Sequence, residues 1–334
     1  MPSYEAILLI GFGGPEKPAD VIPFLENVLR GRNVPRGRLL EVAGHYYHFG
    51  GVSPINSQMR ELKAALESEL RARGPQLPVY WGNRNWTPML ADTVRQMRAD
   101  GVRRAVALVM SAYSSYSGCR QYLEAIESAR ATAGAGAPEI DKLRLFYNHP
   151  GFIEPMAERV RDAYAQIPSE RRGAAALVYT AHSVPVSMAA TSRYEVQLKE
   201  ACRLISEQLG RIHWTLAYQS RSGPPSQPWL GPDISDCLRQ LPASGTRDVV
   251  IVPAGFISDH MEVLYDLDTE ARALCDQLGL HMVRATTVGN HPAFVRMIRE
   301  LVLERMGEAP PRWLGDQGPS QDVCEPDCCA LPAR

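Results

Sequence analysis

Short apolar runs rich in β-branched residues alternate along the chain with amphipathic stretches whose apolar positions recur every three or four residues. This alternation is typical of an α/β fold in which parallel strands are joined by helical crossovers. The runs that predict strands are Glu5–Ile10, Val79–Gly82, Arg104–Met110, Leu143–Tyr147, Ala174–Thr180, Trp214–Tyr218, Asp248–Val252 and Met282–Ala285. The stretches that predict helices are Val21–Leu29, Ser57–Arg73, Leu90–Ala99, Gln121–Thr132, Ile153–Ala165, Tyr194–Leu209, Leu264–Leu278 and Ala293–Met306.

The two halves of the chain repeat one pattern. A glycine is followed by an apolar run and then by small residues, both at Asp100–Ser115 and at Ser244–Asp259. In the same way, the opening strand and the glycines after it resemble Val178–Pro185. Because the candidate strands divide evenly between the halves, the sequence predicts two similar doubly wound, Rossmann-like domains, each with a parallel four-stranded sheet.

The expected domain boundary lies near residues 150 to 172, after the first set of strands. We assign residues 1–150 to the first domain and residues 151–307 to the second. The pattern leaves open whether the last helix packs back on the first domain. Residues 308–334 are rich in proline, glycine and serine and are expected to form a tail that owes any fixed structure to its cysteines.

The composition is that of an ordinary globular protein, with 334 residues of which 45% are apolar. A formal net charge of −1, without a cluster of Lys and Arg, argues against nucleic acid as a partner. No basic segment precedes the first apolar run, and no stretch approaches about 18 uninterrupted apolar residues. We therefore expect a cytoplasmic location, which leaves peripheral contact with a membrane open. Seven unevenly spaced cysteines make a disulfide framework a poor explanation.

The segment Ser258–Glu270 carries acidic residues at a regular spacing. Glu262, Asp266 and Glu270 recur every four residues, so on a helix they would line one face, with Asp259 a turn earlier. The segment follows a strand run and so begins at the carboxyl edge of a sheet, where open α/β sheets bind ligands. A solvated acidic helix face is one interpretation. A column of carboxylates beside a histidine could instead conduct and hold a cation.

His182 is a second candidate at such an edge, because it closes the strand run that begins at Ala174. A lone histidine in this position is more often structural than catalytic. The acidic segment, however, begins at the edge of the same predicted sheet. His182 and Glu262 could therefore share a divalent cation or accept protons around it.

Several segments resemble the signature segments of ferrochelatases, in the family's order, from about residue 5 to about residue 305. They are Phe12–Glu16 (FGGPE), Gly50–Asn56 (GGVSPIN), Thr180–Pro185 (TAHSVP), Gln219–Pro224 (QSRSGP), Pro228–Pro232 (PWLGP) and Ser258–Asp266 (SDHMEVLYD). The stretch His45–Asn56 is especially similar to actinobacterial members, whose route to haem uses coproporphyrin III. The resemblance implies the chelatase fold and the insertion of Fe(II) into coproporphyrin III, giving coproheme and two released protons.

Carried over by position, the resemblance implies that His182 is the axial metal-site residue or proton acceptor and that Glu262 is its partner. Asp266 and Glu270 would extend an acidic path, although the sequence does not decide from which side iron enters. The partners implied are the porphyrin and ferrous iron, with transient contact to neighbouring haem-pathway enzymes.

The porphyrin is expected to lie between the two domains. The residues that the resemblance places along the macrocycle or its carboxylates are Phe12, Arg30, Tyr46, Ser53, Arg84 and Tyr122. Arg30 and Arg84 are candidate propionate partners because a guanidinium can bond a carboxylate bidentately. Simple surface charge is the alternative for both arginines, and Phe12 could equally be a core residue. Some coproporphyrin-using relatives carry at position 12 a tyrosine able to ligate the product iron, which this chain lacks.

Three other functions stay open. The chain could be a chelatase for protoporphyrin IX or for another tetrapyrrole and metal, a non-catalytic haem or porphyrin carrier, or an iron–sulfur redox sensor. The presence of both His182 and Glu262 favours catalysis, because a carrier needs a ligand but no acidic path for protons and metal.

The tail segment Cys324–Cys329 resembles the C-terminal cysteine cluster through which some ferrochelatases bind a [2Fe–2S] centre. Its three thiolates need a fourth ligand, since such clusters usually take four cysteines. In several members that ligand lies in the region that here reads Asn148–Glu154, which has no cysteine, so Cys119 is the best replacement. A zinc site or uncoordinated thiols are the alternatives. The candidate cluster ligands are Cys119, Cys324, Cys328 and Cys329.

Overall fold

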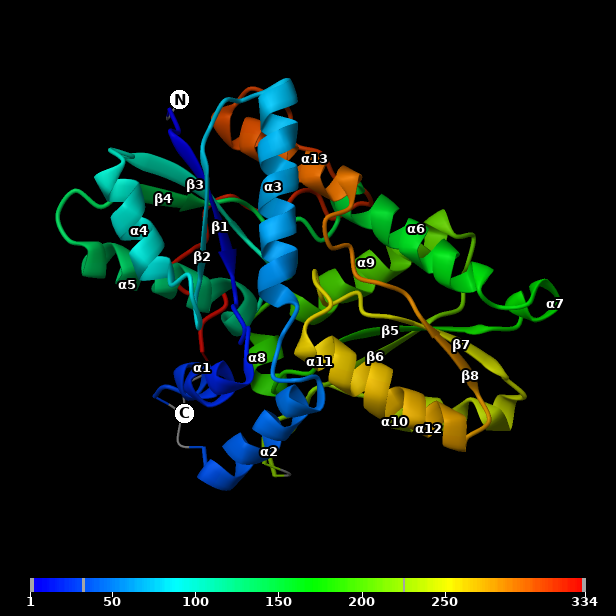
Figure 1. Cartoon of the computed structure of the whole chain (residues 1–334). Helices are drawn as coiled ribbons and strands as arrows, with labels where there is room; N and C mark the ends of the chain where they lie inside the picture. The colour runs from blue at the N-terminus through cyan, green and yellow to red at the C-terminus, as the bar shows by residue number, and fades with distance from the viewer. Residues whose placement is uncertain (1–2, 32–33, 225, 332–334) are drawn as a thin grey trace. The chain divides into compact units, whose positions relative to one another are not determined.

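The computed structural model describes residues 3–31, 34–224 and 226–331, which divide into two compact units (Figure 1). The first unit comprises Met1–Met110, Gln121–Leu143 and Ile298–Pro310. The second comprises Ser111–Arg120, Arg144–Met297 and Pro311–Arg334. The chain therefore crosses between the units several times, and the last helix, α13 (Pro292–Met306), contributes to both. Residues 332–334 of the predicted tail lie outside the described part.

The first unit is built on a parallel sheet of four strands in the order β2-β1-β3-β4. Its strands are β1 (Ala6–Gly11), β2 (Val79–Asn83), β3 (Arg104–Val109) and β4 (Glu139–Lys142). Ile7 lies opposite Val79 on one side and Val106 on the other, so β1 is a central strand. Every residue of β1 is buried, which explains why its sequence is continuously apolar rather than alternating.

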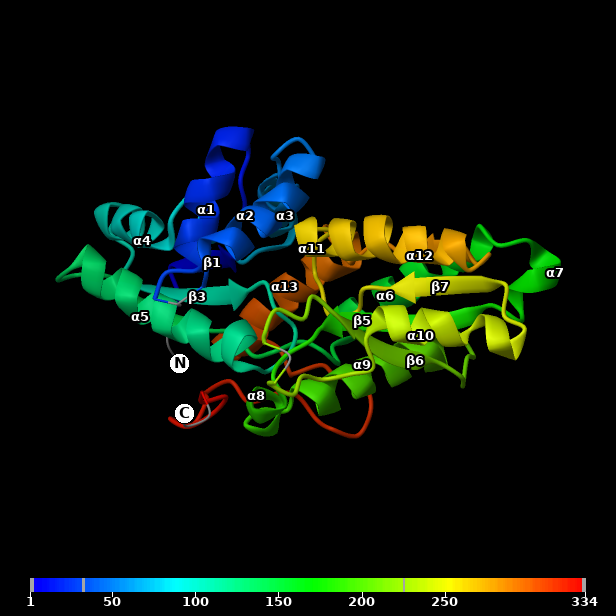
Figure 2. The same ribbon diagram turned by 90° about the horizontal axis from the view of Figure 1, so that it is seen from below.

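The helices of this unit are α1 (Val21–Val28), α2 (Arg36–His48), α3 (Ile55–Arg73), α4 (Leu90–Ala99) and α5 (Gln121–Ala133), with a 3₁₀ turn at Pro18–Asp20. Helices α1 and α2 pack against each other, and α3, α4 and α5 cover the faces of the sheet. Side chains of α4 and α5, such as Val94 and Ile126, pack on the face that carries Leu8 and Ala107. Helix α3 lies on the opposite face (Figure 2).

The second unit repeats this architecture around a parallel sheet in the order β6-β5-β7-β8. Its strands are β5 (Ala176–His182), β6 (Thr215–Gln219), β7 (Asp248–Val252) and β8 (His281–Arg284). Its helices are α6 (Pro150–Ala165), α7 (Ser169–Arg172), α8 (Val186–Ala190), α9 (Tyr194–Gln208), α10 (Ile234–Gln240), α11 (Met261–Val263) and α12 (Arg272–Gln277), with a 3₁₀ turn at Pro242–Ser244. Two π-helical segments, Tyr116–Arg120 and Leu264–Ala271, complete it.

Two layers of helices sandwich the second sheet. Val178, Ala217 and Ile251 face α10 and the helical segment that runs from α11 to α12. On the other face, the hydroxyl groups of Tyr179 in β5 and Ser206 in α9 lie 2.8 Å apart in a hydrogen bond. Figure 1 shows α10 and α12 below the strands of this sheet and α6 and α9 above them. Because strand neighbours in register point to the same face, His182 and its partner Gln219 both project towards the α11–α12 side.

The α/β fold with two parallel four-stranded sheets is confirmed. One strand prediction is wrong: the fourth strand is Glu139–Lys142, not Leu143–Tyr147. Residues 143–147 are all buried, but the ladder with β3 ends where the Leu143 N–H donates to the Ala107 carbonyl. The apolar pattern of residues 143–147 reflects their burial and not pairing with a neighbouring strand.

The helix predicted at Leu264–Leu278 is not α-helical throughout, because its first half is the π-helix Leu264–Ala271. The sequence did not predict α2, α7, α8, α10 or α11. Glycines at positions 37 and 44 interrupt the helical period of α2. Within residues 3–31, 34–224 and 226–331, none of the helices combines the length and the apolar character that crossing a lipid bilayer requires.

Candidate active site

His182 is the last residue of β5, so its ring stands at the carboxyl edge of the second sheet. Its Nδ1 lies 2.5 Å from the Ser183 carbonyl oxygen. A carbonyl oxygen can only accept a hydrogen bond, so Nδ1 carries the proton and, in the neutral ring, Nε2 keeps its lone pair. The Tyr194 hydroxyl donates to the His182 carbonyl oxygen at 2.9 Å and steadies the backbone of the same residue.

Glu262 lies beside this lone pair, with its Oε2 3.9 Å from His182 Nε2. The segment that carries Glu262 begins with a capping interaction in which Glu262 N–H donates to Nδ1 of His260 at 3.2 Å. About half of the Glu262 side chain and a third of the His182 side chain are exposed, at 48% and 34%. The pair is therefore open to an incoming ion while its backbone is held by hydrogen bonds.

Asp266 and Glu270 lie further along the same segment, in the π-helix Leu264–Ala271. Asp266 Oδ2 accepts from Gln219 Nε2 at 3.2 Å and from the Ser220 hydroxyl. Burial, together with the charges of Glu262 and Glu270, raises the pKa of Asp266 to about 6. Burial also raises the pKa of Glu270. Such π-helical turns are uncommon and occur frequently at functional sites.

Two further carboxylates of the segment are neutralised by Arg284, the last residue of β8. Its guanidinium forms a bidentate ion pair with Asp268, at 2.7 and 2.8 Å, and bonds Asp259 at 2.7 Å. Asp259 is thereby turned towards Arg284. Glu262, Asp266 and Glu270 remain as the acidic series that follows His182.

In the first unit, three of the predicted porphyrin-contacting residues lie together. The Arg84 guanidinium lies 5.2 Å from the centre of the Phe12 ring and 5.1 Å from that of Tyr122. Arg84 Nη1 also donates to Gln121 Oε1 at 2.9 Å. Burial raises the pKa of the Tyr122 phenol, while the charge of Arg84 opposes this rise. This arrangement presents a cation between two aromatic faces.

The other three predicted residues are tied to the same region of the first unit. Tyr46 packs edge-on against Phe24, which contacts Phe12 in turn. Arg30 Nη2 donates to the Asn27 side chain at 2.5 Å. Ser53 is buried, and its N–H donates to the Pro15 carbonyl at 2.8 Å.

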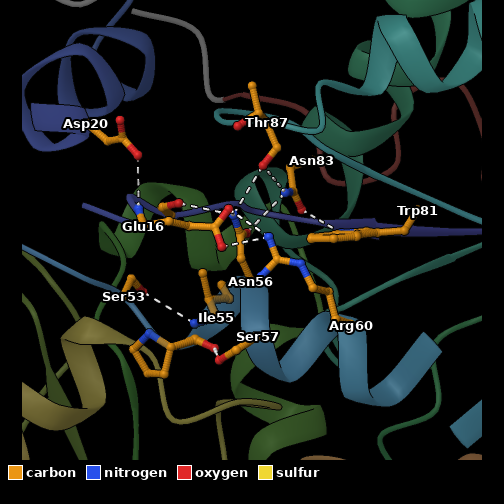
Figure 3. Close-up of polar contacts among 12 residues, drawn as sticks. Glu16, Asp20, Ser53, Ile55, Asn56, Ser57, Arg60, Trp81, Asn83 and Thr87 are labelled. Carbon is orange, nitrogen blue, oxygen red and sulfur yellow. Dashed lines mark hydrogen bonds and ion pairs between the residues drawn. The ribbon is translucent and has the colours of Figure 1, made fainter. Parts of the chain in front are cut away.

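A buried polar network that the sequence did not assign supports the loops carrying Phe12 and Ser53 (Figure 3). Asn56 Nδ2 donates to the carbonyl oxygens of Gly14 and Thr87, at 3.2 and 3.1 Å. Its Oδ1 accepts from Asn83 Nδ2, also at 3.2 Å. Both asparagines are completely buried. Asn56 lies in a segment that resembles the ferrochelatase signatures, but spacing alone gave no hint that it is inside.

The Glu16 carboxylate closes this network at its outer edge. It accepts from Asn56 Nδ2 at 3.3 Å and pairs with Arg60 at 2.6 Å. The Arg60 guanidinium also lies 5.5 Å from the centre of the Trp81 ring. Residues from three separate segments of the chain thus meet around Asn56 (Figure 3).

The structure brings Cys119 and the tail cysteines into one neighbourhood of the second unit. Cys328 Sγ and Cys329 Sγ are 3.8 Å apart. Burial raises the pKa of the Cys328 thiol, and the nearby thiols of Cys324 and Cys119 add to the rise. Arg120, next to Cys119, donates to the Pro326 carbonyl at 2.7 Å and fixes the tail there.

The remaining cysteines, Cys202, Cys237 and Cys275, are buried in α9, α10 and α12. Over residues 3–31, 34–224 and 226–331, no three or more His, Cys, Asp or Glu side chains are grouped as a metal ion would require. The four thiols are therefore neighbours without being an assembled metal cage.

Comparison with known proteins gives a consistent result. The sequence profile of the family described as Ferrochelatase matches residues 4–306. A protein named Ferrochelatase from Rhodopirellula baltica is 54% identical over 336 residues, covering 100% of this chain and 95% of that protein. The Coproporphyrin III ferrochelatase of Streptomyces coelicolor is 51% identical, covering 99% of this chain and 94% of its own.

Among solved structures, SirB from Bacillus subtilis with Fe³⁺ is similar at a TM-score of 0.57. The match covers 92% of this chain and 98% of SirB, at 13% sequence identity. At this identity the likeness concerns the fold alone.

Proposed function

This chain belongs to the ferrochelatase family, and from that premise we propose that it inserts ferrous iron into coproporphyrin III to give coproheme in haem biosynthesis. The substrate is supported by similar relatives that are named Coproporphyrin III ferrochelatase and match nearly the whole chain. The Rhodopirellula baltica relative is named without a substrate. A direct comparison of porphyrins is therefore the decisive experiment.

The observation that carries the proposal is the pairing of His182 with Glu262 at the carboxyl edge of the second sheet. Insertion of Fe(II) requires two protons to leave the pyrrole nitrogens. The unprotonated Nε2 of His182 is suited to accept a proton or to ligate the arriving metal, and the Glu262 carboxylate offsets the positive charge that either step brings. Asp266 and Glu270 extend the acidic series and would pass protons or metal along the segment.

The first unit supplies the groups suited to the macrocycle. Phe12 and Tyr122 offer aromatic faces, and the Arg84 guanidinium beside them is suited to a propionate. We assign Arg30, Tyr46 and Ser53 to the same binding role, because their neighbours connect to the Phe12 region. Phe12 has no hydroxyl group, so the product iron is not ligated by that side chain.

We further propose that Cys119, Cys324, Cys328 and Cys329 hold a [2Fe–2S] cluster. The 3.8 Å separation of Cys328 Sγ and Cys329 Sγ suits thiolates that share a tetrahedral metal ion with metal–sulfur bonds of about 2.3 Å. The influence of Cys324 and Cys119 on Cys328 supports them as the other ligands. When bound, such a cluster supplies a one-electron redox couple. The thiolates themselves would fasten the tail to the segment Tyr116–Arg120.

We place the reaction in the cytoplasm, where ferrous iron and the cysteines, none of which forms a disulfide among the described residues, would stay reduced. Transient contact with neighbouring enzymes of haem synthesis is part of the proposal, because a free porphyrin product is poorly soluble and reactive.

The test is an anaerobic assay with two porphyrins. The purified protein receives Fe(II) with either coproporphyrin III or protoporphyrin IX, and formation of the iron complex is followed by visible absorbance. We expect a higher kcat/KM for coproporphyrin III. An equal or reversed preference would remove the substrate assignment while leaving the family intact. Binding of either porphyrin without iron insertion would favour a carrier.

A further inference from the structure

Gln219 ends β6 directly beside the strand end that carries His182. The two residues are partners in the register of the parallel sheet, and Ser183 N–H donates to the Gln219 carbonyl at 2.8 Å. The Gln219 side chain is only 1% exposed. A buried glutamine at this place needs an explanation, because long polar side chains are rarely inside.

Its amide nitrogen bridges two points of the acidic segment. Gln219 Nε2 donates to the Glu262 backbone carbonyl at 3.0 Å and to the Asp266 carboxylate at 3.2 Å. Both partners are acceptors, so the orientation of the amide is fixed by chemistry. The amide oxygen, Oε1, is buried without a hydrogen-bond partner. The amide nitrogen thus donates to two acceptors of the acidic segment, while the amide oxygen of the same side chain is left without a donor.

The contact between Gln219 and the Glu262 backbone bears on the position of Glu262 with respect to His182. The carboxylate of Glu262 is half exposed, and its N–H is held by the His260 cap within the same segment. Gln219 joins the two sides, since its backbone bonds the residue after His182 and its side chain bonds the backbone of Glu262. Ser220 adds a hydroxyl on Asp266 alone.

We infer that Gln219 is a positioning residue for iron insertion, which sets the separation between His182 and Glu262 by tying the start of the acidic segment to the end of β5. The inference rests on the metal-site roles proposed for these two residues. A displacement of about 1 Å in a reacting group can lower a rate by about 100-fold. A neutral amide can hold two acidic groups in place without adding a charge that would compete with iron.

The test replaces the amide with an apolar side chain of similar length. Gln219→Met should raise the apparent KM for Fe(II) by about tenfold and lower kcat, because Glu262 and Asp266 lose their common donor. The KM for the porphyrin should not change. Partial unfolding alone would lower the maximal rate but leave both KM values unaltered, so the split separates positioning from stability. Porphyrin titration gives the concentration of folded sites.

Gln197 provides a matched control, because it is also buried, at 3% exposed, and accepts from Ser114 N–H at 2.7 Å. Gln197→Met should leave both KM values unchanged. If Gln219→Met does not fold, Gln219→Asn keeps the amide but shortens its reach, and the KM for Fe(II) should rise about threefold.

Gln219 variants that fold and keep the parental KM for Fe(II) would overturn the inference, whatever their stability. Failure of the proposed metal site would be seen separately. In that case His182→Ala would remain active, whereas a failure of the Gln219 inference leaves His182→Ala inactive.

Discussion

The Nε2 atom of His182 lies 3.9 Å from the Oε2 atom of Glu262, and the Ser183 carbonyl fixes the proton of the histidine on the opposite ring nitrogen. This separation is too long for a direct hydrogen bond. Two ligands bound to one tetrahedral ion by bonds of about 2.0 to 2.2 Å lie about 3.4 Å apart, so a divalent ion could contact both atoms after small side-chain movements. The proximity of these two side chains leads to a prediction for variants of His182 and Glu262.

His182→Ala and Glu262→Gln should each lower the rate of iron insertion by at least about 100-fold, because each removes a proton acceptor or metal ligand. Porphyrin affinity, measured by fluorescence quenching, should stay within about threefold, since neither residue belongs to the groups assigned to the macrocycle. His213→Ala is the control, because His213 is exposed in the same unit. An active variant that carries both His182→Ala and Glu262→Gln would contradict the assignment of these two residues as the metal site.

The raised pKa of Asp266 should make the free energy of unfolding depend on pH. Burial raises its pKa to about 6 in the folded protein, from an ordinary value of 3.8. The folded state therefore binds more protons than the unfolded state between these values, and stability falls as the pH rises through about 4 to 6. Asp266→Asn removes this cost and keeps an oxygen that can accept from Ser220.

We expect Asp266→Asn to be more stable than the parent above pH 6, by about 3 kcal/mol, and within about 1 kcal/mol of it at about pH 4. Urea unfolding at several pH values measures the difference. The control is Asp236→Asn, because Asp236 is 66% exposed. A stability difference that is the same at every pH would contradict the raised pKa of Asp266.

The sequence predicted the sheets well because buried parallel strands leave continuous apolar runs, as in Asp248–Val252, where prediction and strand agree at both ends. It placed His182 and the acidic segment at the same sheet edge for the same reason. It could not predict the π-helix Leu264–Ala271. Carboxylates spaced every four residues fit an α-helix equally well, and the spacing carries no signal for the wider turn.

The buried asparagines were missed for a different reason. Asn56 and Asn83 belong to a residue type that is mostly exposed in folded proteins, so composition does not indicate their burial. Their burial depends on carbonyl groups from distant loops that fold around them. By contrast, Cys119 was chosen as the fourth ligand because Asn148–Glu154 has no cysteine, and in the structure its thiol lies near that of Cys328. Its role as a ligand stays a prediction.

Removal of the Arg84 charge should weaken porphyrin binding selectively. Arg84→Met keeps much of the packing on Phe12 and Tyr122 but cannot bond a carboxylate. We expect the KM for coproporphyrin III to rise about tenfold with kcat nearly unchanged. A tenfold rise corresponds to the loss of one hydrogen bond between charged groups, which contributes about 1.5 kcal/mol. Arg95→Met, at an exposed ion pair of the same unit, is the control.

A porphyrin whose propionates are esterified gives a second check on Arg84. The parent and Arg84→Met should bind this ester with equal affinity. An equal loss of affinity for the acid and the ester would mean that Arg84 packs against the ring rather than bonding a propionate.

The cysteine cluster can be tested by metal analysis. Protein purified anaerobically should contain about two irons per chain and show visible absorbance typical of a [2Fe–2S] centre. Cys119→Ser should lose both signals, because the tail alone offers three thiolates. Cys275→Ser, which changes a buried thiol of the α12 core, should retain them. Iron and absorbance that survive in Cys119→Ser would exclude this residue as the fourth ligand.

The buried hydrogen bonds around Asn56 should contribute more to the free energy of unfolding than a surface hydrogen bond does. Asn56→Leu leaves the Gly14 and Thr87 carbonyls and the Asn83 amide with fewer partners in a buried place (Figure 3). We expect a loss of about 2–4 kcal/mol in the free energy of unfolding, measured by urea titration. Ser57→Ala is the control: its exposed side chain donates only to the Pro54 carbonyl, so the loss should be about 0.5 kcal/mol or less. Equal losses in both variants would show that the asparagine network adds no stability beyond a surface hydrogen bond.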